Sequence, residues 1–421
     1  MYHRSKSVLF DLFYRGVYMS IIVIGGGSSG MMAAITAAKA GSKVTLLEGN
    51  KSLGKKLLLT GHGRCNVTNN THRQEFLTHV YDQPRFLYSA LASFDQDDMI
   101  RLLEDEGCKL KVEDHHRVFP VSDNSRDILN VLIKLLKRYH VDIKTNTKVV
   151  DMIIEDHSVK YIILDNGERM SADHYILCTG GLTMSRIGST GDGYKFIEKC
   201  HTLSPLSPAL VPLKATVLDR SCKNLQGTSL KDISLSLVRN NKVIKSMSGD
   251  LLFTHFGISG PVILKMSRFV EENDSIYIDL LPDIKDLDKV LVDTLQTHPK
   301  QTLRTHLGRL IPDKLSDLLL AYYHLEDKKA AQLNKKDRLQ LVHTMKHLPI
   351  TNIKPLGYDA AMITKGGISL KEIDPKTMRS KIIDNLSFAG EIIDLDGETG
   401  GYNLQIAWST GYLAGSSIEN D

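Results

Sequence analysis

Apolar residues follow three different patterns along the chain. Up to about residue 195, and again from residue 353, short apolar runs of strand length alternate with helical or Gly-rich segments. The run IIVI at 21–24 fits a buried parallel strand, and an Ala-rich segment typical of a helix follows it and ends at Gly41. This order of strand, turn and helix predicts an α/β domain.

The pattern changes between residues 196 and 352. Segments such as PALVPLKATV and DSIYIDLLP read as strands and predict a small β-domain over 196–284. Over 285–352 apolar residues recur at i, i+3 and i+4, which predicts a helical domain. The pattern therefore predicts that the α/β segments at 19–195 and 353–421 are separated by two inserted domains.

The overall composition is that of an ordinary globular protein. The chain has 421 residues, of which 42% are hydrophobic and 24% charged, and no apolar run reaches the ~18 residues of a membrane span. Its five cysteines form no C-x-x-C pair and its sixteen histidines no H-E-x-x-H motif. We therefore expect no metal site, reduced thiols and a cytoplasmic location, without a membrane partner.

The first eighteen residues, MYHRSKSVLFDLFYRGVY, form a segment apart from the rest. They are basic and aromatic, but too short and interrupted for a secretory signal. We expect Met19 to be the natural start and residues 1–18 to be an extension that is not native. The alternative is a short arm that touches a membrane.

The segment GGGSSG carries the first chemical signal. Gly25, Gly27 and Gly30 match G-x-G-x-x-G between a predicted strand and a predicted helix. The first permits a tight turn, the second lets a pyrophosphate approach the backbone, and the third brings helix and strand together. A second strand ends at Glu48, where a carboxylate accepts hydrogen bonds from ribose hydroxyls. Together these residues predict a site for FAD or NAD.

The C-terminal segment favours FAD. In LSFAGEIIDLDGETGGYNLQIAWSTGYLAG, residues 386–415, a strand meets Gly390-Glu391, a Gly-rich loop follows, and a helix begins near Asn403. Such a segment, returning to an N-terminal nucleotide site, is typical of glutathione-reductase-like flavoproteins. The N-terminus of its helix can direct its dipole at the flavin pyrimidine, which stabilises the anionic reduced ring.

Longer segments make a resemblance specific: GKKLLLTGHGRCNVTN, RVFP, GSTGDGY, PALVPL, LLFTHFGISGP, TKGGISLKEIDPKTMRSK and FAGEIIDLDGETGGYNLQIAWSTG. Together they resemble the BaiN/YhiN-like flavoprotein family from about residue 21 to the C-terminus. The resemblance implies a discontinuous glutathione-reductase-like (Rossmann-type) FAD-binding domain, with an inserted small β-domain and an inserted helical domain.

The same resemblance implies a set of FAD-binding residues. The pyrophosphate and ribose side comprises Gly25, Gly27, Ser29, Gly30, Glu48, Thr179 and Gly180, with Val149 as a backbone contact to adenine. Expected beside the cofactor and along the flavin are Arg64, Cys65, Asn66, Gly390, Glu391, Asn403, Leu404 and Gln405.

The loop LLLTGHGRCNVTNN, residues 57–70, places a cation, a thiol and an amide among glycines. These glycines let the backbone run close to a flat ring, and Arg64 supplies positive charge near phosphates or the reduced flavin. Cys65 is interpreted as a packing residue, with a redox thiol as the alternative. The catalytic proton donor stays open among four candidates: Lys56, His62, Arg64 and Cys65.

Charge is unevenly distributed along the chain. Residues 299–354 hold eleven Lys or Arg against five Asp or Glu, whereas the whole chain has a net charge of only +4. A basic insert suits a polyanionic substrate, because phosphate neutralisation dominates non-specific nucleic-acid affinity. A solvated helical face is the alternative.

No second dinucleotide motif follows the first, so NAD(P)H would be a transient electron donor at the open flavin face.

Members of the resembled family have been linked to three reactions: reduction of conjugated C=C bonds in steroid-like molecules, reduction of uridine to dihydrouridine in ribosomal RNA, and oxidation of small amines. The basic insert favours the RNA reaction, by hydride transfer from flavin N5. The alternatives are a reductase of small enone-like molecules using NAD(P)H, an oxidase of small amines, and a non-catalytic flavin redox sensor. The sequence does not indicate an oligomeric state.

Overall fold

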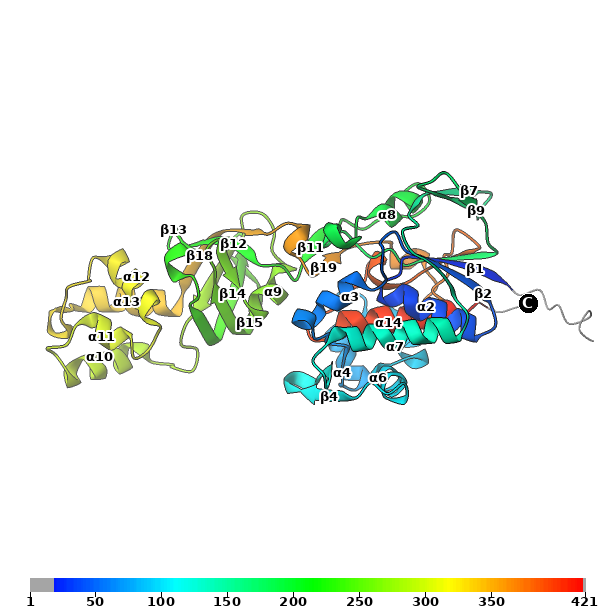
Figure 1. Cartoon of the computed structure of the whole chain (residues 1–421). Coiled ribbons are helices and arrows are strands. Elements are labelled where there is room, and N and C mark those ends of the chain that lie inside the picture. Colours follow the sequence, from blue (N-terminus) through cyan, green and yellow to red (C-terminus); the bar gives the residue numbers. More distant parts are fainter. Residues whose placement is uncertain (1–18, 419–421) are drawn as a thin grey trace, which may run out of the picture. The chain divides into compact units, whose positions relative to one another are not determined.

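The computed structural model describes residues 19–418, which fall into two compact units, shown in Figure 1. Unit 1 comprises residues 19–207 and 363–418, and unit 2 comprises residues 208–362. The expected extension, residues 1–18, lies outside the described residues.

The boundaries differ from those expected from the pattern. Residues 196–207 were expected in the inserted β-domain and lie in unit 1. Residues 353–362 were expected in the FAD-binding domain and lie in unit 2. The second difference arises because a strand that begins at Leu348 belongs to the sheet of unit 2.

A five-stranded parallel sheet forms the centre of unit 1. In spatial order its strands are β20 (Leu386–Phe388), β10 (His174–Leu177), β1 (Ser20–Ile24), β2 (Lys43–Leu47) and β6 (Asp142–Lys144). The four apolar residues of β1 are all buried, as expected of a strand covered on both faces. The predicted α/β fold is confirmed.

Two helices from opposite ends of the chain pack together in unit 1, α2 (Ser28–Lys39) and α14 (Tyr402–Ser416). Figure 1 shows them side by side, in blue and red. Glycines allow the close approach, because an added Cβ on Gly411 would lie 2.4 Å from the backbone oxygen of Ser29. The C-terminal helix thereby reaches the turn that was expected to bind pyrophosphate.

The rest of unit 1 surrounds this core. Its other helices are α3 (Lys55–Leu59), α4 (Arg73–Thr78), α5 (Tyr88–Ser93), α6 (Gln96–Asp105), α7 (Ser125–Arg138) and α8 (Asp192–Ile197). Two antiparallel sheets are β3 (Thr68–Asn69), β5 (Arg117–Pro120) and β4 (Leu110–Glu113), and β7 (Val149–Glu155), β8 (Ser158–Leu164) and β9 (Arg169–Met170). Strand β11 (Ser207–Ala209) spans one boundary between the units, and β19 (Ile363–Lys365) follows the other.

Unit 2 is built on a closed antiparallel barrel. Seven strands follow the order β13-β12-β16-β15-β14-β17-β18, and β18 also pairs with β12, which closes the sheet. The strands are β12 (Leu213–Val217), β13 (Arg220–Ser221), β14 (Ser229–Arg239), β15 (Lys242–Phe253), β16 (Gly257–Ser259), β17 (Ser275–Asp279) and β18 (Leu348–Pro355). Alternate residues such as Leu213, Leu235 and Ile350 are buried and fill the interior.

The helices of unit 2 are inserted between strands of the barrel. Helix α9 (Pro261–Ser267) follows β16. Between β17 and β18 lie α10 (Leu287–Thr297), α11 (Leu303–Leu307), α12 (Asp313–Tyr323) and α13 (Lys335–Lys346). Their buried leucines belong to the same apolar cluster as the barrel interior, so the two segments expected as separate domains share one core. Within residues 19–418, no helix is long and apolar enough to cross a membrane.

Candidate functional site

The turn between β1 and α2 presents one glycine to open space. A Cβ added to Gly25 would lie 2.4 Å from the backbone oxygen of Cys178, and one added to Gly30 would lie 1.8 Å from the backbone oxygen of Gly25. Close packing therefore requires glycine at both positions. Gly27 has a φ of −81° and no atom within 4 Å of its Cβ position. Its backbone is therefore accessible at the first turn of α2, where a pyrophosphate can approach.

Glu48 is held beside this turn. It directly follows β2, and its Oε2 accepts the N–H of Gly26 at 2.9 Å. Its Oε1 accepts from the backbone N–H and the side-chain amide of Asn50, at 2.8 and 2.7 Å. These bonds orient the carboxylate at the carboxyl edge of the sheet, the location at which ribose recognition was expected.

The expected adenine side is formed by the start of β7. Val149 is buried, and two residues before it the N–H of Thr147 donates to the oxygen of Glu48 at 2.9 Å. Between them, Lys148 pairs with Asp192 at 2.9 Å. Burial raises the pKa of Asp192, but hydrogen bonds from Lys148, Thr190 and Lys195 outweigh it and lower that pKa to about 2.

Two of the expected cofactor residues carry buried oxygens with no hydrogen-bond partner among residues 19–418, Oγ1 of Thr179 and Oδ1 of Asn66. Buried side-chain oxygens of this kind normally have a hydrogen-bond partner. Thr179 follows β10 next to the Gly25 turn, and Gly180 after it has a φ of 72°. These unpartnered oxygens and the open backbone at Gly27 fit a polar, phosphate-containing ligand, so the residues present fit FAD.

The C-terminal segment returns to the same turn through Gly390. This residue has a φ of 78°, and an added Cβ would lie 2.4 Å from Oγ of Ser29. Its N–H donates to Oγ1 of Thr410 on α14 at 3.0 Å. The strand–loop–helix segment near the C-terminus is thus anchored at the N-terminus of α2.

Glu391 joins four segments of unit 1. Its Oε2 lies 2.5 Å from Nζ of Lys56, and its Oε1 accepts the N–H of Thr364 at 2.8 Å and the hydroxyl of Thr183 at 3.2 Å. Lys56 also donates to Thr183 at 2.7 Å. Lys56, one of the expected proton-donor candidates, is therefore held as an ion-pair partner beside the Gly390 turn.

The N-terminus of α14 offers backbone donors. Its first hydrogen bond runs from the N–H of Gln405 to the oxygen of Gly401 at 3.0 Å, and no side chain caps it. The N–H groups of Asn403 and Leu404 precede that bond and have no acceptor within the helix. The side-chain amide of Asn403 is bonded to Gly397 on the preceding loop, at 2.9 and 2.8 Å.

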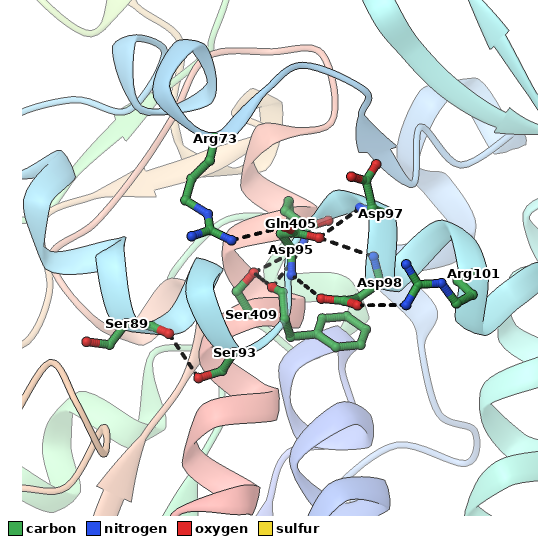
Figure 2. A network of polar contacts seen from close by, with 10 residues as sticks. Arg73, Ser89, Ser93, Asp95, Asp97, Asp98, Arg101, Gln405 and Ser409 are labelled. Carbon is green, nitrogen blue, oxygen red and sulfur yellow. Dashed lines mark hydrogen bonds and ion pairs between the residues drawn. The ribbon is translucent and has the colours of Figure 1, made fainter.

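The side chain of Gln405, in contrast, is fully buried. It accepts the hydroxyl of Thr68 at 2.7 Å and donates to Oγ of Ser409 at 3.0 Å. Both Gln405 and Ser409, shown in Figure 2, donate to the backbone oxygen of Phe94, at 3.4 and 2.6 Å, next to Asp95, which caps α6. The protein itself satisfies this amide, so any contact of Gln405 with a flavin would have to involve its backbone.

Arg64 has acidic partners of its own, which the sequence did not indicate. It donates to Glu113 and, through Nε, to Asp123 at 2.8 Å, and its guanidinium lies 4.1 Å from the ring centre of Phe119. The hydrogen bonds to Glu113 and Asp123 raise the pKa of Arg64. Its charge is therefore compensated at the β4–β5 hairpin. His62, two residues earlier, is exposed with a φ of 58°.

Cys65 is fully buried, with a φ of 60°. Burial raises the pKa of its thiol to about 12, and a hydrogen bond to Thr60 opposes this only in part. Because the thiolate is the reactive form of cysteine, such a group is inert at neutral pH. This environment fits the packing interpretation.

The loop that contains these residues lies against the Gly-rich loop before α14. The amide of Asn69 donates to the oxygens of His115 and Gly400, both at 3.0 Å. The indole N–H of Trp408 donates to the oxygen of Val67 at 3.0 Å. Residues 57–70 and 397–401, far apart in the sequence, therefore meet at the start of α14.

His79, which the sequence did not point to, lies beside the Gly-rich loop before α14. Nδ1 of His79 is 3.2 Å from Oε2 of Glu398, and its ring stacks on Tyr402 with centres 4.5 Å apart. A histidine held by a carboxylate is a suitable general acid. No sequence signal could have found this pair, because 319 positions separate the two residues.

Within residues 19–418, no group of three or more His, Cys, Asp or Glu residues could hold a metal ion.

Comparisons with known proteins cover nearly the whole chain. The family model described as HI0933-like protein Rossmann domain matches residues 19–417. A protein of Haemophilus influenzae named ribosomal RNA dihydrouridine synthase is 33% identical over 405 residues, which is 95% of this chain and 98% of that protein. A Clostridium scindens protein named 3-dehydro-bile acid delta(4,6)-reductase is 32% identical over 93% of this chain and 97% of that protein.

A solved structure resembles the chain in fold. It is a 3-ketosteroid delta1-dehydrogenase from Sterolibacterium denitrificans, with a TM-score of 0.51 and 13% identity. The alignment covers 94% of this chain and 98% of the dehydrogenase. At this identity the similarity concerns the fold alone.

Proposed function

The chain belongs to the HI0933-like family of FAD-dependent oxidoreductases, as its resemblance to BaiN/YhiN-like flavoproteins predicted, and we propose that it reduces uridine to dihydrouridine in ribosomal RNA. The family, the fold and the class of enzyme are the premises. The RNA substrate is the proposal.

The proposal rests first on a shared chemistry. Reduction of uracil and reduction of an unsaturated ketone both add hydride to the β-carbon of a conjugated C=C bond and a proton to the α-carbon. The names of both relatives describe reactions of this type. Bound FAD would supply the hydride from N5 of its reduced ring, and NAD(P)H is the proposed donor that reduces it.

The residues of this chain would bind and orient the cofactor. The open backbone at Gly27 and the N-terminus of α2 would hold the pyrophosphate, and Glu48 a ribose. The N–H groups of Asn403 and Leu404 would face the flavin pyrimidine. His79 is the proposed proton donor, because its partner Glu398 lies on the loop that leads into α14.

One observation favours RNA over a small molecule. Two exposed lysines of the barrel in unit 2, Lys214 and Lys354, have no acidic partner in the described structure. Unpaired cations on an accessible surface suit a polyanionic substrate. Such an enzyme would act in the cytoplasm, where the sequence led us to expect it.

The second candidate is a reductase of small enone-like molecules. The 32% identity to the bile acid reductase supports it, because this value is close to the identity with the ribosomal RNA enzyme. Identity alone therefore does not select the substrate.

The decisive experiment is mass spectrometry of ribosomal RNA from the source cells with and without this gene. We expect one dihydrouridine position to be lost in the deletion and restored by the intact gene. A Gly27→Val copy should not restore it, because the side chain would occupy the space proposed for the pyrophosphate. An unchanged dihydrouridine profile would refute the RNA proposal, and the purified protein would then be assayed with enones and amines.

A further inference from the structure

Part of the positive charge counted between residues 299 and 354 is paired with acids in the fold. Four of its cations form ion pairs: Arg304 with Asp317, Lys328 with Asp337, Arg338 with Asp288, and Lys346 with Asp279. Two of these aspartates precede the basic stretch in the sequence, so the sequence count could not include them. The helical insert is therefore less basic than its sequence suggests.

A different pair of lysines lies on the barrel. Lys214 of β12 and Lys354 of β18 are direct cross-strand partners in an antiparallel pair. Both side chains are exposed, and neither has an ion-pair or hydrogen-bond partner among the described residues. Like charges directly opposite each other destabilise a sheet. A folded protein that keeps such a pair without an acid beside it is suited to an anionic partner.

The surface next to this pair can contact nucleotides in other ways. Further along the same two strands, the hydroxyls of Thr216 and Thr351 lie 3.0 Å apart, and Asn352 donates to Thr216 at 3.0 Å. These groups can bind phosphate or ribose oxygens. Asp219 accepts the Thr351 hydroxyl at 2.9 Å and marks the end of this polar row.

An aromatic turn flanks Lys214 on its other side. The oxygen of Phe256, in the turn between β15 and β16, accepts the N–H of Ala215 at 3.2 Å. His255 beside it is exposed, and the two rings meet edge to face with centres 5.0 Å apart. Gly257 pairs with Lys214 and adds no side chain between the turn and the lysine. The segment LLFTHFGISGP, one of those that carry the family resemblance, thus lies in the barrel.

We propose that the outer face of β12 and β18, with the β15–β16 turn, is the surface on which structured RNA docks. Lys214 and Lys354 contact phosphates, and His255 and Phe256 offer ring surface to an unstacked base. This combination of paired cations and adjacent aromatic rings is how proteins bind single-stranded loops within folded RNA. The inference rests on the proposed function, since it names the contact surface for that substrate.

The test compares two double variants of the full-length holoenzyme. K214Q/K354Q removes the barrel pair, and K335Q/K336Q removes two exposed, unpaired lysines at the start of α13 with the same change in charge. Binding to a transcribed ribosomal RNA hairpin is measured by filter retention over a range of salt. The barrel variant should bind about tenfold more weakly near physiological salt, and its log–log salt slope should fall by about 1.5–2. The control should change less than about twofold, because its charges are only part of the general field.

A third variant tests the aromatic turn. His255→Ala should weaken binding to the hairpin loop but leave binding to a duplex of equal length unchanged. FAD content and melting temperature identify a folding defect in any variant. The barrel variant should melt no lower than wild type, because it loses a like-charge repulsion.

Equal RNA affinity of the two double variants, in an enzyme that does form dihydrouridine, would overturn the docking surface and leave the proposed function intact. Absence of dihydrouridine formation by the wild type, with lysine-dependent RNA binding, would overturn the proposed reaction and leave the docking surface intact.

Discussion

The ammonium group of Lys56 lies 2.5 Å from the carboxylate of Glu391, although 335 positions separate the two residues. Both side chains are more than two-thirds buried. The pair links the segment after the Gly-rich turn to the segment that returns from the C-terminus. It is therefore a contact on which the assembly of the proposed FAD site depends.

Removing both partners should cost less than the sum of the two single removals. Lys56→Met leaves the Glu391 carboxylate with only its two neutral donors, at a cost of about 1 kcal/mol in the free energy of unfolding. The melting temperature should fall by a few degrees. In a double-mutant cycle with Glu391→Gln, the double variant should lose less than the sum of the two single losses. Additive losses would show that the ion pair contributes nothing of its own.

The two glycines at 27 and 30 should respond differently to substitution. Gly27→Val has room for its side chain and a φ that other residues adopt, so this variant should fold with a near-wild-type melting temperature and purify without FAD. Gly30→Val would force its Cβ to within 1.8 Å of the oxygen of Gly25 and should not fold. Absorbance near 450 nm and circular dichroism provide the two readouts. A yellow Gly27→Val protein would contradict the pyrophosphate assignment.

The thiols should differ in reactivity toward a thiol reagent at pH 8. Burial raises the pKa of Cys65 and Cys178 to about 12 and that of Cys222 to about 11. Cys108 is also buried, and only Cys200 is partly exposed. We expect about one equivalent to react in the native protein and all five after denaturation. Cys65→Ala should keep flavin reduction by its donor. Loss of that reduction in a folded, flavin-loaded variant would restore the redox alternative.

Acid should destabilise the fold through His174. Its Nε2 bonds to the hydroxyl of Ser387 at 2.8 Å inside the parallel sheet. Burial, assisted by the charge of Arg379, lowers the pKa from 6.5 to about 3. Below pH 6.5 the unfolded chain therefore binds a proton that the folded chain does not, and stability falls as the pH drops toward 3.

Between pH 7 and pH 5 this histidine should cost the wild type about 2 kcal/mol in the free energy of unfolding. Urea titrations of wild type and His174→Gln at both pH values measure the difference. The variant should lose about that much less on acidification, whatever its stability at pH 7. Parallel loss in both proteins would exclude His174 as the source.

Local sequence patterns were sufficient to predict the fold class and one half of the proposed nucleotide site. The strand, Gly-rich turn and helix at residues 20–39 are local features, because glycine spacing and apolar runs act on neighbouring residues. The helix near Asn403 was predictable for the same reason. The placement of Glu48 could be inferred because parallel strands end at one edge of a sheet.

Other features depend on contacts that no local pattern encodes. The closure of the barrel by β18 depends on pairing with β12, more than a hundred residues earlier. The acids beside Arg64, the pairing of Lys56 with Glu391 and that of His79 with Glu398 are likewise long-range. The count of basic residues overstates the local charge, because Asp288 and Asp279, which precede the counted stretch, pair with two of its cations. Neighbouring residues therefore encode the elements and the Gly-rich turn, whereas long-range packing selects which charges stay unpaired, because those pairs join residues far apart in the sequence.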